Sequence, residues 1–198
     1  MRSIKNFYLS NRRRLMVERV KRKIDLSDIS IISMNCIGGV MYYDLKQKFI
    51  TPTINLFFTP SDFIKFVNNL NYYLSIEPTI AMGNDYPIGK LDDITLYFMH
   101  YNTPGEALKK WEERKKRINK DKIFIIMVER DGFTKKHFEE FNKLNYPKFL
   151  FTKTKDFKCE DSLYMSKYKD LDQLPDIIPG RHIYDGIKLV KAIKKAYG

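Results

Sequence analysis

The sequence is poor in cysteine and has no long apolar run, and each absence excludes a class of protein. Its two cysteines, Cys36 and Cys159, are too few and too far apart to make a disulfide framework or a metal-binding cluster. No stretch approaches the roughly 18 apolar residues of a membrane-spanning helix. The first residues lack an apolar core followed by a small-residue cleavage site, the pattern of a signal peptide. We therefore expect a cytoplasmic protein with reduced thiols, although the sequence leaves a bond between the two cysteines open.

Two common phosphate-binding motifs are also missing. The adjacent glycines Gly38 and Gly39 do not form the spaced-glycine fingerprint of dinucleotide-binding folds. They do not form a P-loop either, because no Gly-Lys-Ser/Thr sequence follows them. A mononucleotide or dinucleotide site of either familiar kind is therefore not predicted.

Positive charge is abundant and unevenly distributed. The net charge is +12, and residues 1–23 carry nine basic side chains against one acid, Glu18, which accounts for most of it. With 43% hydrophobic residues in 198, the rest of the chain is long enough to bury one core. We predict a basic amphipathic N-terminal arm over residues 1–25 and a single domain over residues 26–198.

The arm carries an apolar stripe at Leu9, Met16, Val20 and Ile24, which is typical of an amphipathic helix. The stripe could pack on the domain and leave the basic face in water. Alternatively, residues 1–23 could lie on an anionic membrane surface, which would place the protein at the inner face of the cytoplasmic membrane. Nucleic acid is not an expected partner, because no helix-turn-helix, zinc-finger or RNA-binding signature accompanies the charge.

Short apolar segments alternate with helical patterns along the domain. We predict strands at 29–34, 54–58, 94–101, 122–128, 148–152 and 162–165, the last at a sheet edge. Helices are expected at 37–45, 63–74, 107–119, 134–144 and 186–197, and irregular structure at 76–93. This order indicates a layered α/β domain with a mixed, mostly parallel sheet.

Four loops should meet at the carboxyl ends of these strands, where ligands bind in open α/β sheets. They are the loops 33–39, 59–62, 100–103 and 129–132. In the first, Asn35, Gly38 and Gly39 begin a helix whose free N–H groups could bind an anion, and Arg130 offers a guanidinium to a phosphate. Alternatively, the glycines only allow the helix to pack closely on the sheet.

Three side chains of these loops are candidates for catalysis. Cys36 stands at a helix start, which favours a reactive thiolate. His100 ends a strand and Glu129 follows another, so either could act as a general base. A buried cysteine and a hydrogen-bonded core histidine are the structural alternatives. No metal ligands are predicted, since the acidic pair Asp92–Asp93 precedes a strand and is more typical of a turn.

Several uncommon blocks occur together in one order, at residues 33–39, 53–74, 86–94, 100–101 and 107–119. With these blocks the chain resembles the bacterial domain-of-unknown-function family numbered nineteen-nineteen. Members of that family are often labelled exopolysaccharide or capsule biosynthesis proteins. The resemblance implies a three-layer α/β/α sandwich with a mixed sheet and a role in surface-polysaccharide assembly. It implies no catalytic residues.

We therefore expect an enzyme that transfers a sugar from a nucleotide- or phosphate-linked donor, with an anionic small molecule or nucleotide sugar as its ligand. A divalent cation beside such a donor stays open as a cofactor. Two alternatives also remain. One is a non-catalytic accessory module that binds a phosphorylated glycan or a partner protein, and the other is a Cys36-dependent acyltransferase.

Overall fold

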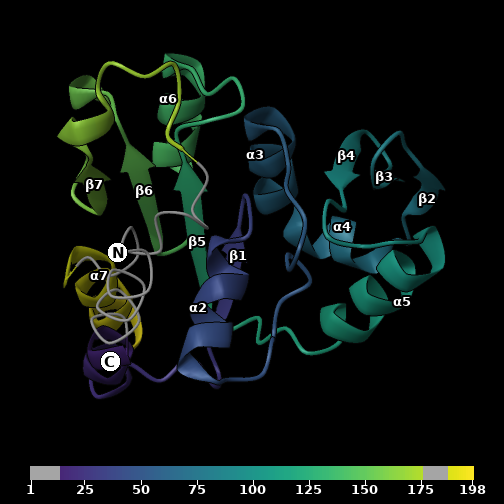
Figure 1. Cartoon of the computed structure of the whole chain (residues 1–198), viewed down its shortest axis with the longest axis horizontal. Coiled ribbons are helices and arrows are strands. Elements are labelled where there is room, and N and C mark those ends of the chain that lie inside the picture. Colours follow the sequence, from purple (N-terminus) through teal and green to yellow (C-terminus); the bar gives the residue numbers. More distant parts are fainter. Residues whose placement is uncertain (1–13, 176–186) are drawn as a thin grey trace, which may run out of the picture.

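The computed structural model describes residues 14–175 and 187–198 (Figure 1). In these ranges, residues 14–21 are helical. The further elements, in chain order, are β1 (Ser30–Ser33), α2 (Ile37–Leu45), α3 (Pro60–Asn68), α4 (Leu70–Ser75), β2 (Thr79–Met82), β3 (Pro87–Leu91), β4 (Ile94–Tyr97), α5 (Pro104–Lys115), β5 (Ile123–Val128), α6 (Lys135–Lys143), β6 (Lys148–Thr152), the short 3₁₀ helix η1 (Lys155–Phe157), β7 (Ser162–Tyr164), the 3₁₀ helix η2 (Ser166–Tyr168) and α7 (Ile187–Tyr197).

A four-stranded parallel sheet forms the centre of the α/β domain. Its strand order is β1-β5-β6-β7, and all three pairings are parallel. The middle strand β5 is buried over its whole length, as a continuous apolar run predicts for a parallel strand that is covered on both faces. The short strand β7 lies at the edge, in agreement with the sequence.

Successive residues of each strand point into two separate cores, so the sheet is covered on both faces. On one face, Ile31 and Phe124 pack with α2, α7 and the N-terminal helix. On the other, Ile32 and Ile125 pack with α3, α5, α6 and the second sheet. This is the predicted α/β architecture with helices on both sides of the sheet.

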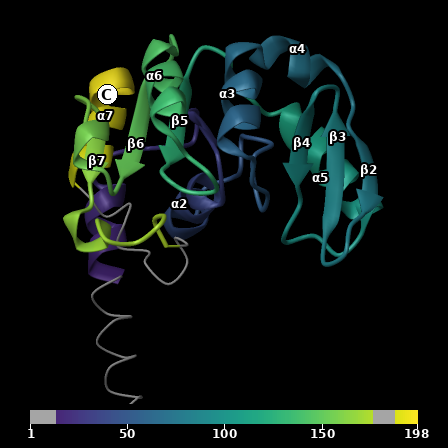
Figure 2. The same cartoon turned by 90° about the horizontal axis from the view of Figure 1, so that it is seen from above.

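Antiparallel strands are present, but they form a second sheet of their own rather than joining the first. The order is β2-β3-β4, with α3 lying between the two sheets in both views (Figures 1 and 2). The prediction of irregular structure at 76–93 was wrong here, because β2 and β3 form a hairpin. Pro87 and Gly89 fall inside β3, and such residues are usually signs of turns.

Two of the predicted strands differ from the structure. The strand predicted at 94–101 ends at Tyr97 as β4. The segment 54–58 makes a single antiparallel bridge, between Phe57 and Tyr97, and is not a strand. Asn55 explains this difference, since its φ of 61° is a left-handed conformation that interrupts an extended chain. The segment still reaches the parallel sheet, where the Phe58 N–H donates to the carbonyl of Met34 at 2.9 Å.

The predicted helix at 63–74 is divided in two. Asn69 ends α3 with φ −128° and also precedes α4. The start is as expected, because the Thr59 hydroxyl accepts a hydrogen bond from the Asp62 N–H at 3.2 Å and caps α3. Thr103 caps α5 in the same way, through the Glu106 N–H.

The described part of the N-terminal arm packs on the domain. Val20 and Ile24 are buried in the core beside α2 and α7, while Arg19, Arg22 and Lys23 are exposed. Residues 1–13 of the predicted arm, with Leu9, lie outside the described residues. No helix in the described ranges is both long and apolar enough to span a membrane.

Candidate functional site

A cavity of about 250 Å³ lies at the carboxyl ends of β1 and β5. Two loops that follow neighbouring parallel strands contribute to it, as predicted for the rim of an open α/β sheet. The second sheet and the segment before α3 close the opposite side. Its lining residues are Asn35, Cys36, Phe57, Tyr86, Met99, Arg130 and Asp131.

The loop after β1 places a buried amide at this cavity. Asn35 is only 7% exposed, and its Oδ1 accepts a hydrogen bond from the Ile37 N–H at 3.3 Å. Its Nδ2 is buried and donates to no group in the described part of the chain. Because an unsatisfied buried donor costs about 1–3 kcal/mol, its place beside a cavity indicates a donor available to a ligand.

The glycines of this loop serve packing rather than the cavity. A Cβ on Gly38 would lie 2.8 Å from Ser33 Oγ and 3.0 Å from Ile31 Cγ2, and one on Gly39 would lie 3.3 Å from Ile54 Cδ1. The Gly38 N–H already donates to Ser33 Oγ at 3.2 Å. The structure thus favours the packing alternative for the glycines, and neither lines the cavity.

Cys36 lines the cavity at the N-cap position of α2 and is 8% exposed. No disulfide joins it to Cys159. His100 does not join Cys36 in the cavity wall; its neighbour Met99 lines the cavity instead. The His100 side chain does not line the cavity, the residue is exposed, and its backbone N–H donates to the carbonyl of Asn55 at 3.4 Å.

The loop after β5 supplies the positive charge of the cavity. The Arg130 side chain is 16% exposed, and its Nε donates to Asp131 Oδ2 at 3.1 Å. Asp131 has φ 56°, and its N–H donates to Gln173 Oε1 at 2.8 Å, which fixes the loop. A guanidinium carries five donors in a planar fork, a geometry that matches the oxygens of a phosphate.

Aromatic rings form the opposite wall. Phe57 stacks on Tyr97 with centroids 4.6 Å apart and meets Tyr86 edge-on at 6.4 Å. Met99 adds a flexible thioether beside them. An aromatic wall opposite a guanidinium and an amide can hold a ring compound with an anionic substituent.

Glu129, the other predicted base, lies outside the cavity wall and holds two loops together. Its carboxylate accepts hydrogen bonds from the N–H groups of Lys153 at 2.8 Å and Thr154 at 3.0 Å. The hydroxyls of Thr152 and Thr154 also donate to it, and Lys153 Nζ lies 3.7 Å away. This side chain is 6% exposed and connects the end of β5 to the loop after β6.

A serine–histidine contact occurs elsewhere, between Ser61 Oγ and His137 Nε2 at 2.9 Å. The Thr134 N–H donates to His137 Nδ1 at 3.0 Å, which makes Nδ1 an acceptor and leaves the proton of the neutral ring on Nε2. The imidazole then donates to the serine hydroxyl and cannot accept its proton. Burial lowers the pKa of His137 and favours this neutral form. The pair joins α3 to the capping box of α6.

The acidic pair Asp92–Asp93 forms the turn between β3 and β4, as the structural alternative predicted. Asp93 accepts hydrogen bonds from Lys65 Nζ at 2.7 Å and Tyr73 Oη at 2.6 Å. Within residues 14–175 and 187–198, no three His, Cys, Asp or Glu side chains are grouped as metal ligands.

The structure therefore unites Asn35, Cys36 and Arg130 in one cavity and separates them from His100 and Glu129. Asp131 lies in the predicted loop 129–132, although it was not among the predicted site residues, and sequence reasoning missed three further lining residues. These three, Phe57, Tyr86 and Met99, come from the second sheet and its bridge to segment 54–58, which the alternation of strands and helices did not reveal.

Comparison with known proteins gives two matches that span nearly the whole chain. A family model described as a domain of unknown function (DUF1919) matches residues 8–195. A protein of Haemophilus influenzae, titled "Uncharacterized protein", is 33% identical over 191 residues, which cover 92% of this chain and 93% of that protein.

Proposed function

Because the chain belongs to the family of the domain of unknown function DUF1919, we propose that it acts in surface-polysaccharide assembly and binds a phosphate-bearing sugar, such as a nucleotide sugar, in the cavity beside Asn35 and Arg130. The family context comes from the resemblance described above. The chemistry of the cavity independently supports the binding of a phosphate-bearing sugar.

One observation carries the proposal: a guanidinium and an unsatisfied buried amide face an aromatic wall across a cavity at the carboxyl ends of two parallel strands. The Arg130 fork would bind the donor phosphate, with Asn35 Nδ2 donating to a phosphate or sugar oxygen. Phe57 and Tyr86 would pack against the sugar or base ring. Together these groups would contact the phosphate and the ring of one ligand.

In the proposed reaction the bond between the sugar and the donor phosphate breaks, and the acceptor hydroxyl forms a new bond to the sugar as it loses its proton. Arg130 would stabilise the charge that develops on the leaving phosphate. Asp131 is the carboxylate that lines the cavity and would accept the proton, a role predicted for His100 or Glu129. We propose that this takes place in the cytoplasm, where both cysteines would stay reduced.

The test measures the melting temperature of the full chain with nucleotide sugars, free nucleotides, sugar phosphates and acyl-CoA, each with and without Mg²⁺. A ligand at a hundred times its dissociation constant adds about 2.7 kcal/mol, a shift of about 5–10 °C for a domain of this size. A shift with phosphate-bearing sugars, followed by release of the nucleotide or phosphate when acceptor glycan is added, supports the transferase. Binding without release favours the accessory module, and no shift with any sugar phosphate contradicts the proposal.

A thiol mechanism is the second candidate, because Cys36 lines the same cavity at a helix N-terminus. In that case acyl-CoA would give the shift, and the thioester bond would break as the acyl group moves to the cysteine sulfur and CoA leaves as a free thiol. Replacement of Cys36 by Ala distinguishes the two candidates. Sugar transfer should survive it, whereas acyl transfer should be abolished.

A further inference from the structure

Per residue, the C-terminal helix α7 is about as basic as the N-terminal arm, although the charge count along the sequence draws attention to the arm alone. Its eleven residues include no acid. Leu189, Val190 and Ile193 are buried in the core. The lysines all lie on the exposed side, and they are Lys188, Lys191, Lys194 and Lys195.

The N-terminal helix lies beside α7, so the two basic faces adjoin. Both figures place the two ribbons next to each other at one end of the molecule (Figures 1 and 2). Val20 and Ile24 share a core cluster with the buried residues of α7. Lys23 and Lys194 line one cavity from the two helix ends, together with Asp25 and Asp28. The outward basic residues of this helix and its end are Arg14, Arg19, Arg22 and Lys23.

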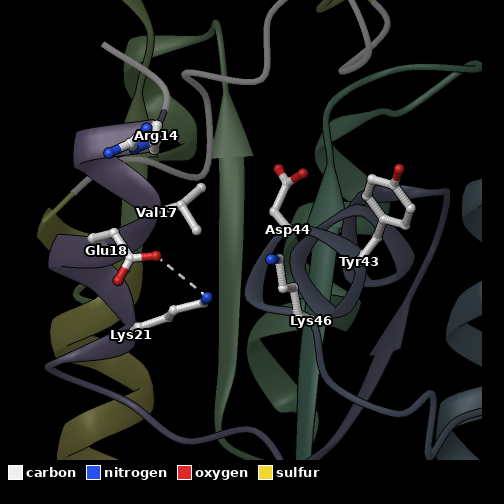
Figure 3. A pocket seen from close by; sticks show the side chains of 7 residues that line it. All are labelled: Arg14, Val17, Glu18, Lys21, Tyr43, Asp44 and Lys46. Carbon is white, nitrogen blue, oxygen red and sulfur yellow. Dashed lines mark hydrogen bonds and ion pairs between the residues drawn. The ribbon is translucent and has the colours of Figure 1, made fainter. Parts of the chain in front are cut away.

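A groove of about 990 Å³ borders this face, between the N-terminal helix and α2 (Figure 3). Arg14 and Lys21 line it from one helix, and Lys46 lines it from the end of the other. Glu18 and Asp44 also line it; Glu18 forms an ion pair with Lys21 at 3.4 Å. The cations outnumber the acids along the groove, as they do on the adjoining helix faces.

Two large side chains protrude from this basic region. Tyr43, on the α2 side of the groove, is 66% exposed, and Leu15, on the N-terminal helix, is 70% exposed. Exposed aliphatic and tyrosine side chains among lysines and arginines are typical of surfaces that lie at a lipid headgroup layer. A nucleic-acid backbone would use the cations but would gain little from the leucine.

We propose that the N-terminal helix, α7 and the groove beside Tyr43 form one docking face for an anionic phospholipid membrane. Lysines and arginines of the two helices contact lipid phosphates, the groove admits a headgroup between Arg14 and Lys46, and Leu15 and Tyr43 enter the interface. Val20 and Ile24 of the apolar stripe are not inserting residues, because both are already buried in the core.

The test is sedimentation of the full chain with vesicles of phosphatidylglycerol mixed with phosphatidylcholine, and with vesicles of phosphatidylcholine alone. We expect binding only to the anionic vesicles, with weaker binding as salt increases. Each surface lysine contributes about fivefold to partitioning, so the double variant Lys188→Gln/Lys191→Gln should bind about thirtyfold less. Absence of wild-type binding to anionic vesicles would overturn the proposal.

A matched control removes the same charge elsewhere. Lys135 and Lys136 on α6 have side chains 81% and 80% exposed, so Lys135→Gln/Lys136→Gln should leave vesicle binding nearly unchanged. An equal loss in this control would mean that net charge alone drives binding and would overturn the assigned face. Tyr43→Ser tests the lipid contact directly and should weaken binding to the anionic vesicles.

Binding to double-stranded DNA separates the remaining alternative. The membrane assignment is wrong if both Lys188→Gln/Lys191→Gln and Tyr43→Ser retain full vesicle binding. If Lys188→Gln/Lys191→Gln also loses DNA binding, the face is a nucleic-acid surface. None of these substitutions touches the cavity beside Arg130, so sugar-phosphate binding should persist in every variant.

Discussion

Replacement of Glu129 distinguishes its structural role from the catalytic role that the sequence predicted. In Glu129→Gln, the amide oxygen can still accept from the N–H groups of Lys153 and Thr154, but these bonds are no longer charge-assisted and the ion pair with Lys153 Nζ is lost. Hydrogen bonds to charged groups contribute about 1 kcal/mol more than neutral ones. We expect a loss of about 2 kcal/mol in the free energy of unfolding.

Replacement of Glu129 by Ala should cost more, because it leaves the same two N–H groups without an acceptor. An unsatisfied donor costs about 1–3 kcal/mol, and we expect about 4 kcal/mol for a site that is partly shielded from water. At about 2–4 °C per kcal/mol, the melting temperature should fall by about 4–8 °C in the Gln variant and by about 8–16 °C in the Ala variant.

Urea denaturation followed by tryptophan fluorescence measures this effect, because the chain has a single tryptophan and Trp111 is 1% exposed. Glu139→Gln serves as the control, since its carboxylate is 56% exposed in a surface pair and should contribute under about 0.5 kcal/mol. If Glu129→Gln unfolds at the same urea concentration as the wild type, the structural role is refuted and Glu129 again becomes a candidate base.

Two further predictions concern stability. Gly38→Ala should destabilise the fold by about 1–3 kcal/mol, because the new Cβ would press on Ser33. Gly39→Ala should cost less, because its nearest contact is a flexible methyl group, and urea midpoints in the reverse order would contradict this packing. Burial depresses the pKa of His137 in the folded state, so the unfolded chain binds more protons at acidic pH. The contribution of neutral His137 to the stability of the fold is therefore complete above pH 6.5, the usual pKa, and is lost as the pH falls through the folded-state pKa. His137→Gln keeps an acceptor for the Thr134 N–H and should remove this part of the pH dependence, as melting curves between acidic and neutral pH will show.

The parallel sheet could be predicted because its strands have strong local signals. The apolar run of β5 is buried throughout, and a small-residue turn separates β1 from α2. Asn35 and Arg130 follow two such strands, and parallel neighbours necessarily bring their carboxyl ends together. This is why half of the cavity could be found from sequence.

The other half depends on contacts between segments distant in sequence. Tyr86 and Met99 reach the cavity through the antiparallel sheet, whose strand β3 contains Pro87 and Gly89. Gly89 is needed because a Cβ there would lie 2.9 Å from Phe98 Cε2, a contact that no local pattern reveals. Pro87 and Gly89 indicated turns in the sequence, and the strand β3 was therefore not predicted.

The central claim is that Arg130 recognises a phosphate group on a sugar. The most direct measurement is the dissociation constant, by calorimetry, of a sugar 1-phosphate and of the same sugar without phosphate, for the wild type, Arg130→Gln and the control Lys135→Gln. We predict that the wild type and the control prefer the phosphorylated sugar, and that Arg130→Gln loses about tenfold or more of its affinity for that form alone. Equal binding of the two sugars by the wild type, or an unchanged dissociation constant in Arg130→Gln, would contradict the account.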